Sequence, residues 1–254
     1  MSPNVGRDEL RSATASRARM PTVMTRVIVG VLTVAAVLCG CSRSVPGQAR
    51  AMSARDRSAP LVSPADLNHL LLDDTRVQTI MGTSGVVTVR RYSTITPSRG
   101  ESYSDPGCSS AVWNTMFPVY DGAGYTGVAG RWVEEPKDGP HHIDQAVVSF
   151  PSADAATRFV IRISMTWQRC ANTQLHTSDP PPSQATQWYD IGYPQLSGDI
   201  STVVDHREGD TGLVETRAIT SRSNVVIDVD TEGAAMYAQQ ATTLISAIAD
   251  NIPH

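Results

Sequence analysis

The stretch ISTVVDHREGDTGLVETRAITSRSNVVIDV, residues 200–229, decides the fold class of this chain. It contains segments rich in β-branched residues at 200–204, 212–220 and 224–229. Polar turns at 206–210 and 221–223 separate these segments. This spacing predicts three successive strands joined by tight turns.

The rest of the chain alternates strand-like and helix-like segments. Further strands are predicted at 86–95, 125–133 and 143–150, with the turn 134–140 joining the last two as a hairpin. Apolar residues at helical spacing predict helices at 64–72, 107–117, 151–170 and 233–251. A polar loop is expected at 172–183, and the segment 77–81 is ambiguous. This order predicts an α+β fold, with a mostly antiparallel sheet packed with helices.

Composition and charge narrow the class of protein. The chain has 254 residues, of which 41% are hydrophobic and 18% charged, as in a globular protein. Its net charge is −4 and its basic residues are scattered, so no nucleic-acid surface is expected. Residues 61–254 are long enough for a single domain with its own core. Residues 41–60, rich in Ser, Arg, Ala and Pro, predict a flexible tether with a reach of roughly 25 Å.

The first forty residues have the features of a lipoprotein signal peptide. An arginine-containing segment precedes an apolar run at 27–38, which is shorter than the roughly 20 residues of a membrane span. The run ends in Leu-Cys-Gly-Cys at 38–41, which resembles the bacterial lipobox. In that motif the thiol of the last cysteine, here Cys41, receives the diacylglycerol. A plain secretory signal or an ordinary apolar helix is the alternative, and translation could start at Met1, Met20 or Met24.

Cleavage before Cys41 has consequences for charge and location. It would remove five arginines and two acidic residues, so the mature chain would carry a net charge of −7. Anionic lipid would repel such a chain, so its acyl chains must hold it on the membrane. The sequence thus predicts a protein anchored to the extracytoplasmic face of the cell membrane.

The sequence contains four cysteines, and the predicted signal peptide and lipid anchor account for two of them. Cys39 leaves with the signal peptide and Cys41 takes the lipid, which leaves Cys108 and Cys170. In an oxidising compartment such an isolated pair favours one disulfide. A metal pair and a catalytic cysteine are the alternatives, but no histidine lies at ligand spacing from either residue. No metal or cofactor is expected.

Motifs that could carry chemistry are better explained as turns. The glycines at 122–127 match G-x-G-x-x-G, but a strand rather than a helix is predicted to follow them. His141 and His142 are neighbours, and neighbouring residues on a strand point to opposite faces, which disfavours a metal site formed by both. The acidic residues at 205–210 lack the spacing of a calcium-binding loop. Surface turns are therefore expected for His141, His142 and Asp144, and for Asp205, Glu208 and Asp210.

Aromatic residues supply the weak candidates for ligand contact. Trp113 and Trp167 lie on predicted helical stripes and are expected in the core. Three aromatic residues could lie at the edge of a cleft, where such side chains bind apolar or sugar ligands; they are Trp132, Trp188 and Tyr189.

The domain resembles the PknH-like extracellular sensor domain of mycobacteria, the outer part of a transmembrane serine/threonine kinase that also occurs alone in lipoproteins. The resembling pieces are Ser-Pro-Ala-Asp-Leu at 63–67, Leu-Leu-Asp-Asp at 71–74, Pro-Gly-Cys at 106–108, Phe-Pro-Ser-Ala-Asp-Ala-Ala at 150–156 and Trp-Gln-Arg-Cys at 167–170. The resemblance implies an antiparallel sheet with packed helices, a large cleft for an unidentified ligand and a Cys108–Cys170 disulfide. The kinase member has a second disulfide further on, which this chain lacks, so 180–197 is expected to be looser.

Together these observations predict a mycobacterial envelope lipoprotein whose sensor-like domain binds an unidentified ligand or protein partner and is not catalytic. No G-x-S-x-G pentad is present. An envelope hydrolase with an unrecognised catalytic triad, whose members would come from distant positions, is one alternative. A protein–protein scaffold is the other.

Overall fold

The computed structural model describes residues 60–97, 100–136, 139–209, 212–234 and 238–253. The predicted signal peptide, the candidate start methionines, Cys41, the tether up to residue 59 and Asp210 lie outside the described residues. Within the described ranges, no helix combines the length and apolar character needed to cross a membrane.

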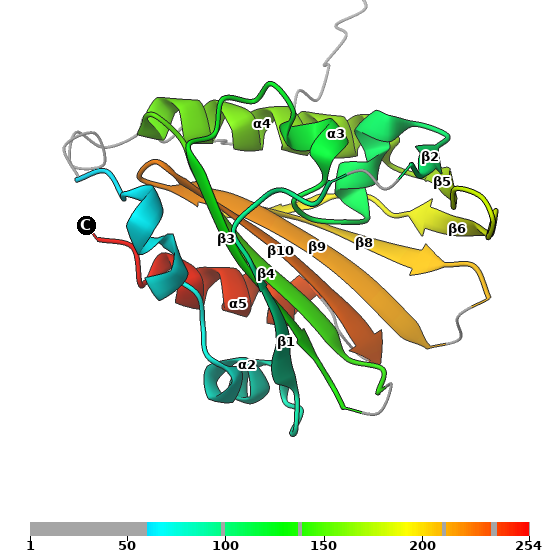
Figure 1. The fold of residues 1–254 in the computed structure, drawn as a ribbon, viewed down its shortest axis with the longest axis horizontal. Coiled ribbons are helices and arrows are strands. Elements are labelled where there is room, and N and C mark those ends of the chain that lie inside the picture. The colour runs from blue at the N-terminus through cyan, green and yellow to red at the C-terminus, as the bar shows by residue number, and fades with distance from the viewer. Residues whose placement is uncertain (1–59, 98–99, 137–138, 210–211, 235–237, 254) are drawn as a thin grey trace, which may run out of the picture. The chain divides into compact units, whose positions relative to one another are not determined.

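A single antiparallel sheet dominates the domain (Figure 1). Its strand order is β1-β3-β4-β10-β9-β8-β6-β5-β2, and β7 also pairs with β8. The strands are β1 (Val87–Tyr92), β2 (Ser102–Tyr103), β3 (Gly127–Glu134), β4 (His142–Ser149), β5 (Thr173–Ser178), β6 (Thr186–Ile191), β7 (Gln195–Ser197), β8 (Ile200–Arg207), β9 (Leu213–Arg222) and β10 (Val225–Ala234). The predicted α+β class and the three successive strands after residue 200 are confirmed.

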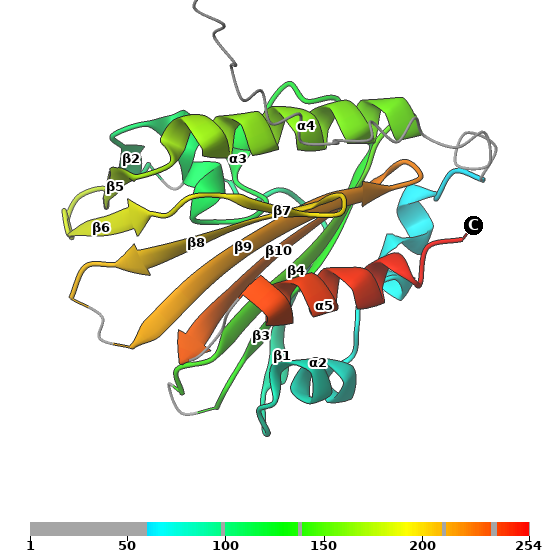
Figure 2. The same cartoon turned by 180° about the vertical axis from the view of Figure 1, so that it is seen from behind.

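Helices cover the two faces of the sheet unequally (Figures 1 and 2). They are the 3₁₀ helices η1 (Pro64–His69) and η2 (Pro106–Ala111), with α2 (Asp74–Met81), α3 (Phe117–Tyr120), α4 (Ala153–Cys170) and α5 (Ala238–Ala249). The helices α4 and α5 pack against β9 and β10 from opposite sides. Because side chains alternate along a strand, each face has its own core.

The face under α5 is mainly apolar at its centre. Ile227 and Val229 of β10 pack there in one cluster with Leu244 and Ile248. On the opposite face, α4 packs over Val226, at the start of β10. Further along that strand the same face carries acidic residues, so α4 covers only part of it.

The long helix α4 begins and packs as the sequence predicts. Ser152 caps it by accepting a hydrogen bond from the amide of Ala155. Its stripe of Val160, Ile163 and Trp167 is buried against the sheet. This helix therefore covers one end of the sheet.

The predicted helix over 107–117 is wrong. The helix η2 ends at Ala111, and α3 begins only at Phe117. Between them, Asn114 donates hydrogen bonds to the carbonyls of Asp144 and Asp228, at 3.2 and 3.3 Å. These buried bonds to the sheet replace helical ones, which apolar spacing could not reveal.

Three other segments differ from expectation, and the structure assigns the ambiguous segment to a helix. The polar segment at 172–183 includes a strand, β5, which pairs with β6 and β2. The helix expected over 64–72 is the shorter 3₁₀ helix η1, and the ambiguous segment at 77–81 belongs to α2. The strand β10 extends to Ala234, where a helix was predicted. The segment 180–197 contains β6 and β7, and its looser packing relative to the kinase member stays a prediction.

Candidate functional site

Two rows of paired residues cross the part of the sheet that α4 leaves uncovered. One row runs through Asp205, Glu215, Glu232 and His142, and the other through Arg217, Asp230, Asp144 and Trp132. Directly paired residues of antiparallel strands project from the same face. The rows lie two residues apart along each strand, so both face the same way.

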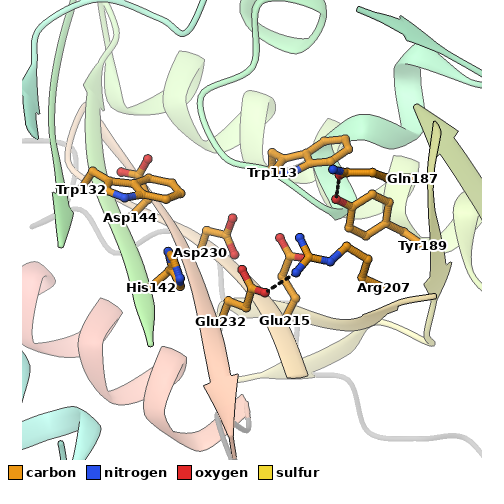
Figure 3. A pocket seen from close by; sticks show the side chains of 10 residues that line it. All are labelled: Trp113, Trp132, His142, Asp144, Gln187, Tyr189, Arg207, Glu215, Asp230 and Glu232. Carbon is orange, nitrogen blue, oxygen red and sulfur yellow. Dashed lines mark hydrogen bonds and ion pairs between the residues drawn. The ribbon is translucent and has the colours of Figure 1, made fainter. Parts of the chain in front are cut away.

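A cavity of about 270 Å³ lies over these rows (Figure 3). Aromatic side chains stand at its sides, with Trp132 across from Trp113 and Tyr189. Its polar lining consists of His142, Asp144, Gln187, Arg207, Glu215, Asp230 and Glu232. Four carboxyl groups thus share the cavity with one arginine.

Contacts between aromatic rings position one side of the cavity. Trp113 meets Tyr189 edge to face, with ring centroids 4.9 Å apart, and Tyr103 at 5.9 Å. The Tyr189 hydroxyl donates to Gln187 at 2.7 Å. The predicted core position is confirmed for Trp167, which is buried. Trp113 is only partly buried: it packs against the same core cluster and also lines the cavity, because the helix predicted to carry it ends early.

The three aromatic candidates for ligand contact separate into two groups. Trp132 and Tyr189 both line the cavity. Trp188 does not: it projects from the other face of β6, is 37% exposed and lies 4.4 Å from the His176 ring, centroid to centroid. Adjacent residues of a strand point to opposite faces, so only one of Trp188 and Tyr189 can face the cavity.

Arg217 lies beneath the cavity, where its two terminal nitrogens are hydrogen-bonded and its Nε atom has no hydrogen-bond partner. It is buried and forms an ion pair with Asp228 at 2.5 Å, and it also donates to the carbonyl of Val229. Asp228 in turn accepts hydrogen bonds from the Tyr120 hydroxyl at 2.8 Å and the Thr115 amide at 3.1 Å. This buried network leaves Arg217 committed to Asp228.

Asp230 has no such partner. Its Oδ1 atom is buried and accepts no hydrogen bond, although the side chain points toward the cavity. Burial, followed by the charge of Glu215, raises the pKa of Asp230 well above its ordinary value. A buried acceptor without a donor is costly unless a bound group supplies one.

The neighbouring carboxyl groups are perturbed in the same direction. Burial raises the pKa of Asp205 and of Glu215, and the charge of a neighbouring carboxyl group, Asp230 for Asp205 and Asp205 for Glu215, adds to each shift. Burial raises the pKa of Asp144 to about 6, although the hydrogen bond from the Tyr92 hydroxyl, at 2.6 Å, opposes the shift. Desolvation is thus the largest cause throughout the cluster.

Comparison with known proteins places this domain in a family. The PknH-like extracellular domain family matches residues 62–251. The chain belongs to this family. It is 31% identical over 192 residues to serine/threonine-protein kinase PknH of Mycobacterium bovis, covering 75% of this chain and 31% of that protein. PknH of Mycobacterium tuberculosis matches over 192 residues with the same identity, covering 30% of its length.

A solved structure supports the same assignment. The extracellular domain of PknH from Mycobacterium tuberculosis aligns with a TM-score of 0.71 and 31% identity, covering 76% of this chain and 98% of that one. The chain spans about a third of the length of its curated kinase relatives. What it shares with them is therefore the PknH-like extracellular domain.

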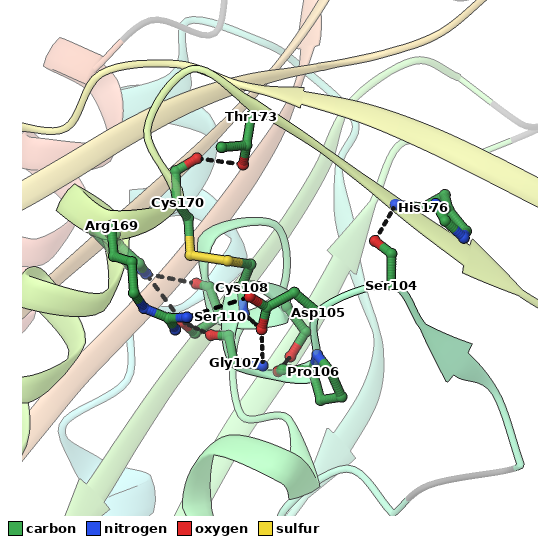
Figure 4. Close-up of a disulfide and its surroundings, with 12 residues drawn as sticks. Ser104, Asp105, Pro106, Gly107, Cys108, Ser110, Arg169, Cys170, Thr173 and His176 are labelled. Atoms are coloured by element: carbon green, nitrogen blue, oxygen red, sulfur yellow. Dashed lines mark hydrogen bonds and ion pairs between the residues drawn. A yellow bond between two sulfur atoms is a disulfide. The ribbon is translucent and has the colours of Figure 1, made fainter.

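The predicted disulfide is present in this PknH-like domain (Figure 4). Cys108 of η2 and Cys170 at the end of α4 are bonded, with their Cα atoms 5.7 Å apart. An ion pair between Arg169 and Asp105, at 3.2 Å, joins the same two elements. Trp167 also donates to the carbonyl of Ser110. These links hold η2, and with it Trp113, beside the cavity.

Sequence reasoning missed the acidic residues. Asp205 was expected in a solvated turn with Glu208, but it is buried within β8, which continues to Arg207 because β6 and β9 both pair with it. A signal was available: charged residues alternate along β9 and β10, as Glu215 and Arg217 show. Such alternation on a strand predicts one polar face.

The histidine cluster also needs correction. His142 and Asp144 face the cavity rather than a surface turn, because β4 begins at His142. His141 points away and pairs with Glu135 at 2.6 Å. The glycine run at 122–127 does form a turn, with positive φ at Gly122 and Gly124. In the part of the chain that the structure describes, no group of three or more His, Cys, Asp or Glu residues could hold a metal ion.

Proposed function

We propose that this protein is a lipid-anchored envelope protein whose PknH-like extracellular domain binds a small ligand in the cavity between Trp132 and Tyr189, without catalysing a reaction. One observation carries the proposal. A partly open cavity with aromatic sides is lined by Asp230, whose buried Oδ1 atom has no hydrogen-bond partner. Pockets with aromatic walls and a few converging polar groups are typical of small-molecule sites.

The proposed location rests on the sequence and the family together. The signal-like leader and the Leu-Cys-Gly-Cys motif at 38–41 favour lipidation at Cys41 and a place outside the cytosol. The matching family is described as extracellular, and the Cys108–Cys170 disulfide suits an oxidising compartment. Lipid on Cys41 would hold the domain at the membrane despite the acidic net charge of the chain.

Ligand capture from an envelope extract tests the binding function. The full chain, purified in detergent, would be incubated with mycobacterial envelope lipids and glycans and examined by native mass spectrometry. We expect one adduct, lost in a Trp132→Ala variant and retained in Trp188→Ala, because Trp132 lines the cavity and Trp188 does not. If no adduct forms, or if both variants lose it equally, the cavity is not the binding site.

A scaffold function is the second candidate. Ile161 and Met165 are 53% and 68% exposed on the outer side of α4, beside Arg158 and Arg162. Exposed apolar side chains that cluster can mark a protein interface. A hydrolase receives no comparable support, since the described residues that line the cavity include neither serine nor cysteine. Labelling by a serine-directed probe would nevertheless favour the hydrolase.

A further inference from the structure

We propose that the cavity takes an organic cation, an amine or guanidinium group on a flat body that lies between Trp132 and Tyr189. This inference rests on the proposed function, because it names the chemical class of the ligand for that same cavity. Three features of the site support it: its charge, its aromatic sides and its size.

The charge balance favours a cation. Asp144, Glu215, Asp230 and Glu232 line the cavity, and Arg207 pairs with Glu232 at 3.4 Å. The other nearby arginine, Arg217, is buried below and bonded to Asp228. Among the described residues no cation donates a hydrogen bond to Asp230 Oδ1, although the charge of Arg217 acts on Asp230 from below.

The unpartnered oxygen specifies a hydrogen-bond donor. Asp230 is 7% exposed, and its Oδ1 accepts no hydrogen bond from the protein. A ligand N–H would supply the missing donor, and a positive charge on it would strengthen the bond. An anionic ligand would supply no positively charged donor to this oxygen and would lie beside four acidic side chains.

The aromatic sides suit the same ligand. Cations are attracted to the faces of tryptophan and tyrosine rings, and Arg90 already lies over the Trp132 ring, 5.7 Å from its centroid. Trp113 and Tyr189 offer further aromatic surface across the cavity. A flat body on the ligand would fill the space between these side chains.

Size and ligand chemistry argue for an organic cation rather than a metal ion. A volume of about 270 Å³ is close to the lower end of ordinary ligand pockets, which begin near 300 Å³. It is far larger than a bare ion needs. Among the residues that the structure describes, no group of three or more His, Cys, Asp or Glu side chains is arranged so that it could hold a metal ion.

Probes that differ only in charge test the inference. Phenethylammonium, 2-phenylethanol and phenylacetate would be titrated into the full detergent-purified chain by calorimetry, with calcium chloride as a fourth titrant. We expect phenethylammonium to bind about tenfold more tightly than the neutral alcohol, and phenylacetate to bind least. An Asp230→Asn variant should lose most of this preference, whereas Asp250→Asn, an exposed control, should keep it.

The comparison of probes on the unaltered chain does not depend on how well a variant folds. If the alcohol or phenylacetate binds as tightly as the amine, or if calcium binds more tightly, the cation assignment is overturned while a ligand site in this cavity stands. If phenethylammonium does not bind, the assignment also fails. The extract experiment above then decides whether the cavity binds any ligand.

Discussion

At the scale of single residues, the acidic cluster makes the domain sensitive to pH. Asp230 holds its proton to a higher pH in the folded chain than in the unfolded chain, because burial raises its pKa. The folded state therefore binds more protons, and the free energy of unfolding falls as pH rises through the folded pKa. Asp144, with a pKa of about 6, acts in the same direction between about pH 4 and pH 6.

An Asp230→Asn substitution should remove part of the decrease in the free energy of unfolding that occurs as pH rises. The amide stays neutral at every pH, so the variant should gain stability relative to the unaltered chain as pH rises from about 5 to 8, by about 1.4 kcal/mol per unit of pKa shift. Thermal unfolding across this range measures the difference, with Asp250→Asn as the control. A constant difference between Asp230→Asn and the unaltered chain would show that the pKa of Asp230 is not raised.

At the scale of single elements, α4 offers a matched pair of positions. Ile163 is buried against the sheet and Ile161 is 53% exposed. We expect Ile163→Ala to destabilise the domain by about 2–5 kcal/mol through the cavity it leaves. Ile161→Ala should change stability by less than about 0.5 kcal/mol. Denaturant unfolding checks both, and equal effects would contradict the packing of α4.

The disulfide joins two elements that are far apart in the sequence. Cys108 and Cys170 are separated by 62 positions, so reduction would release a long loop in the unfolded chain. We expect a Cys108→Ser, Cys170→Ser double variant to lose up to about 4 kcal/mol of stability. It should also be insensitive to dithiothreitol, which should destabilise only the unaltered chain. Equal sensitivity of the two proteins would contradict the bond.

Helices and strands were predictable where the periodicity of apolar residues alone determines them. The stripe of α4 and the strands after residue 200 follow from periodicity alone. The sequence pattern could not reveal that the helix predicted over 107–117 is interrupted. The hydrogen bonds of Asn114 and Thr115 to the sheet interrupt it, and they depend on residues far away in the sequence. The strand β5 was missed because its exposed polar residues resemble those of a loop.

The candidate site was less predictable than the fold. Trp132 and Tyr189 were identified as aromatic candidates, but Trp188 faces away because strand phase decides which neighbour points inward. The acidic cluster was missed, since its members come from four separate strands and meet only through register. Asp205 was placed in a turn because the length of β8 depends on its pairing with β6 and β9.

At the scale of the whole molecule, the sheet has one face covered by α5, η1 and α2 and another that α4 only partly covers. That asymmetry leaves the acidic rows accessible from one side. The lipid proposed at Cys41, followed by a tether, would present this domain to the space outside the membrane.

The anchor itself gives a clear prediction. Expressed in a mycobacterium and separated with a phase-forming detergent, the full chain should enter the detergent phase and incorporate labelled palmitate. A Cys41→Ala variant should do neither, because each buried CH₂ contributes roughly 0.8 kcal/mol to membrane attachment and the acidic chain adds none. Aqueous partitioning of the unaltered chain would contradict lipidation.

The most direct measurement is a crystal structure of the chain after incubation with the envelope extract. The proposed function requires electron density for a bound molecule between Trp132 and Tyr189, with a ligand atom within hydrogen-bond distance of Asp230 Oδ1. Density only elsewhere, for example over Ile161 and Met165, with the cavity holding nothing but solvent, would contradict it.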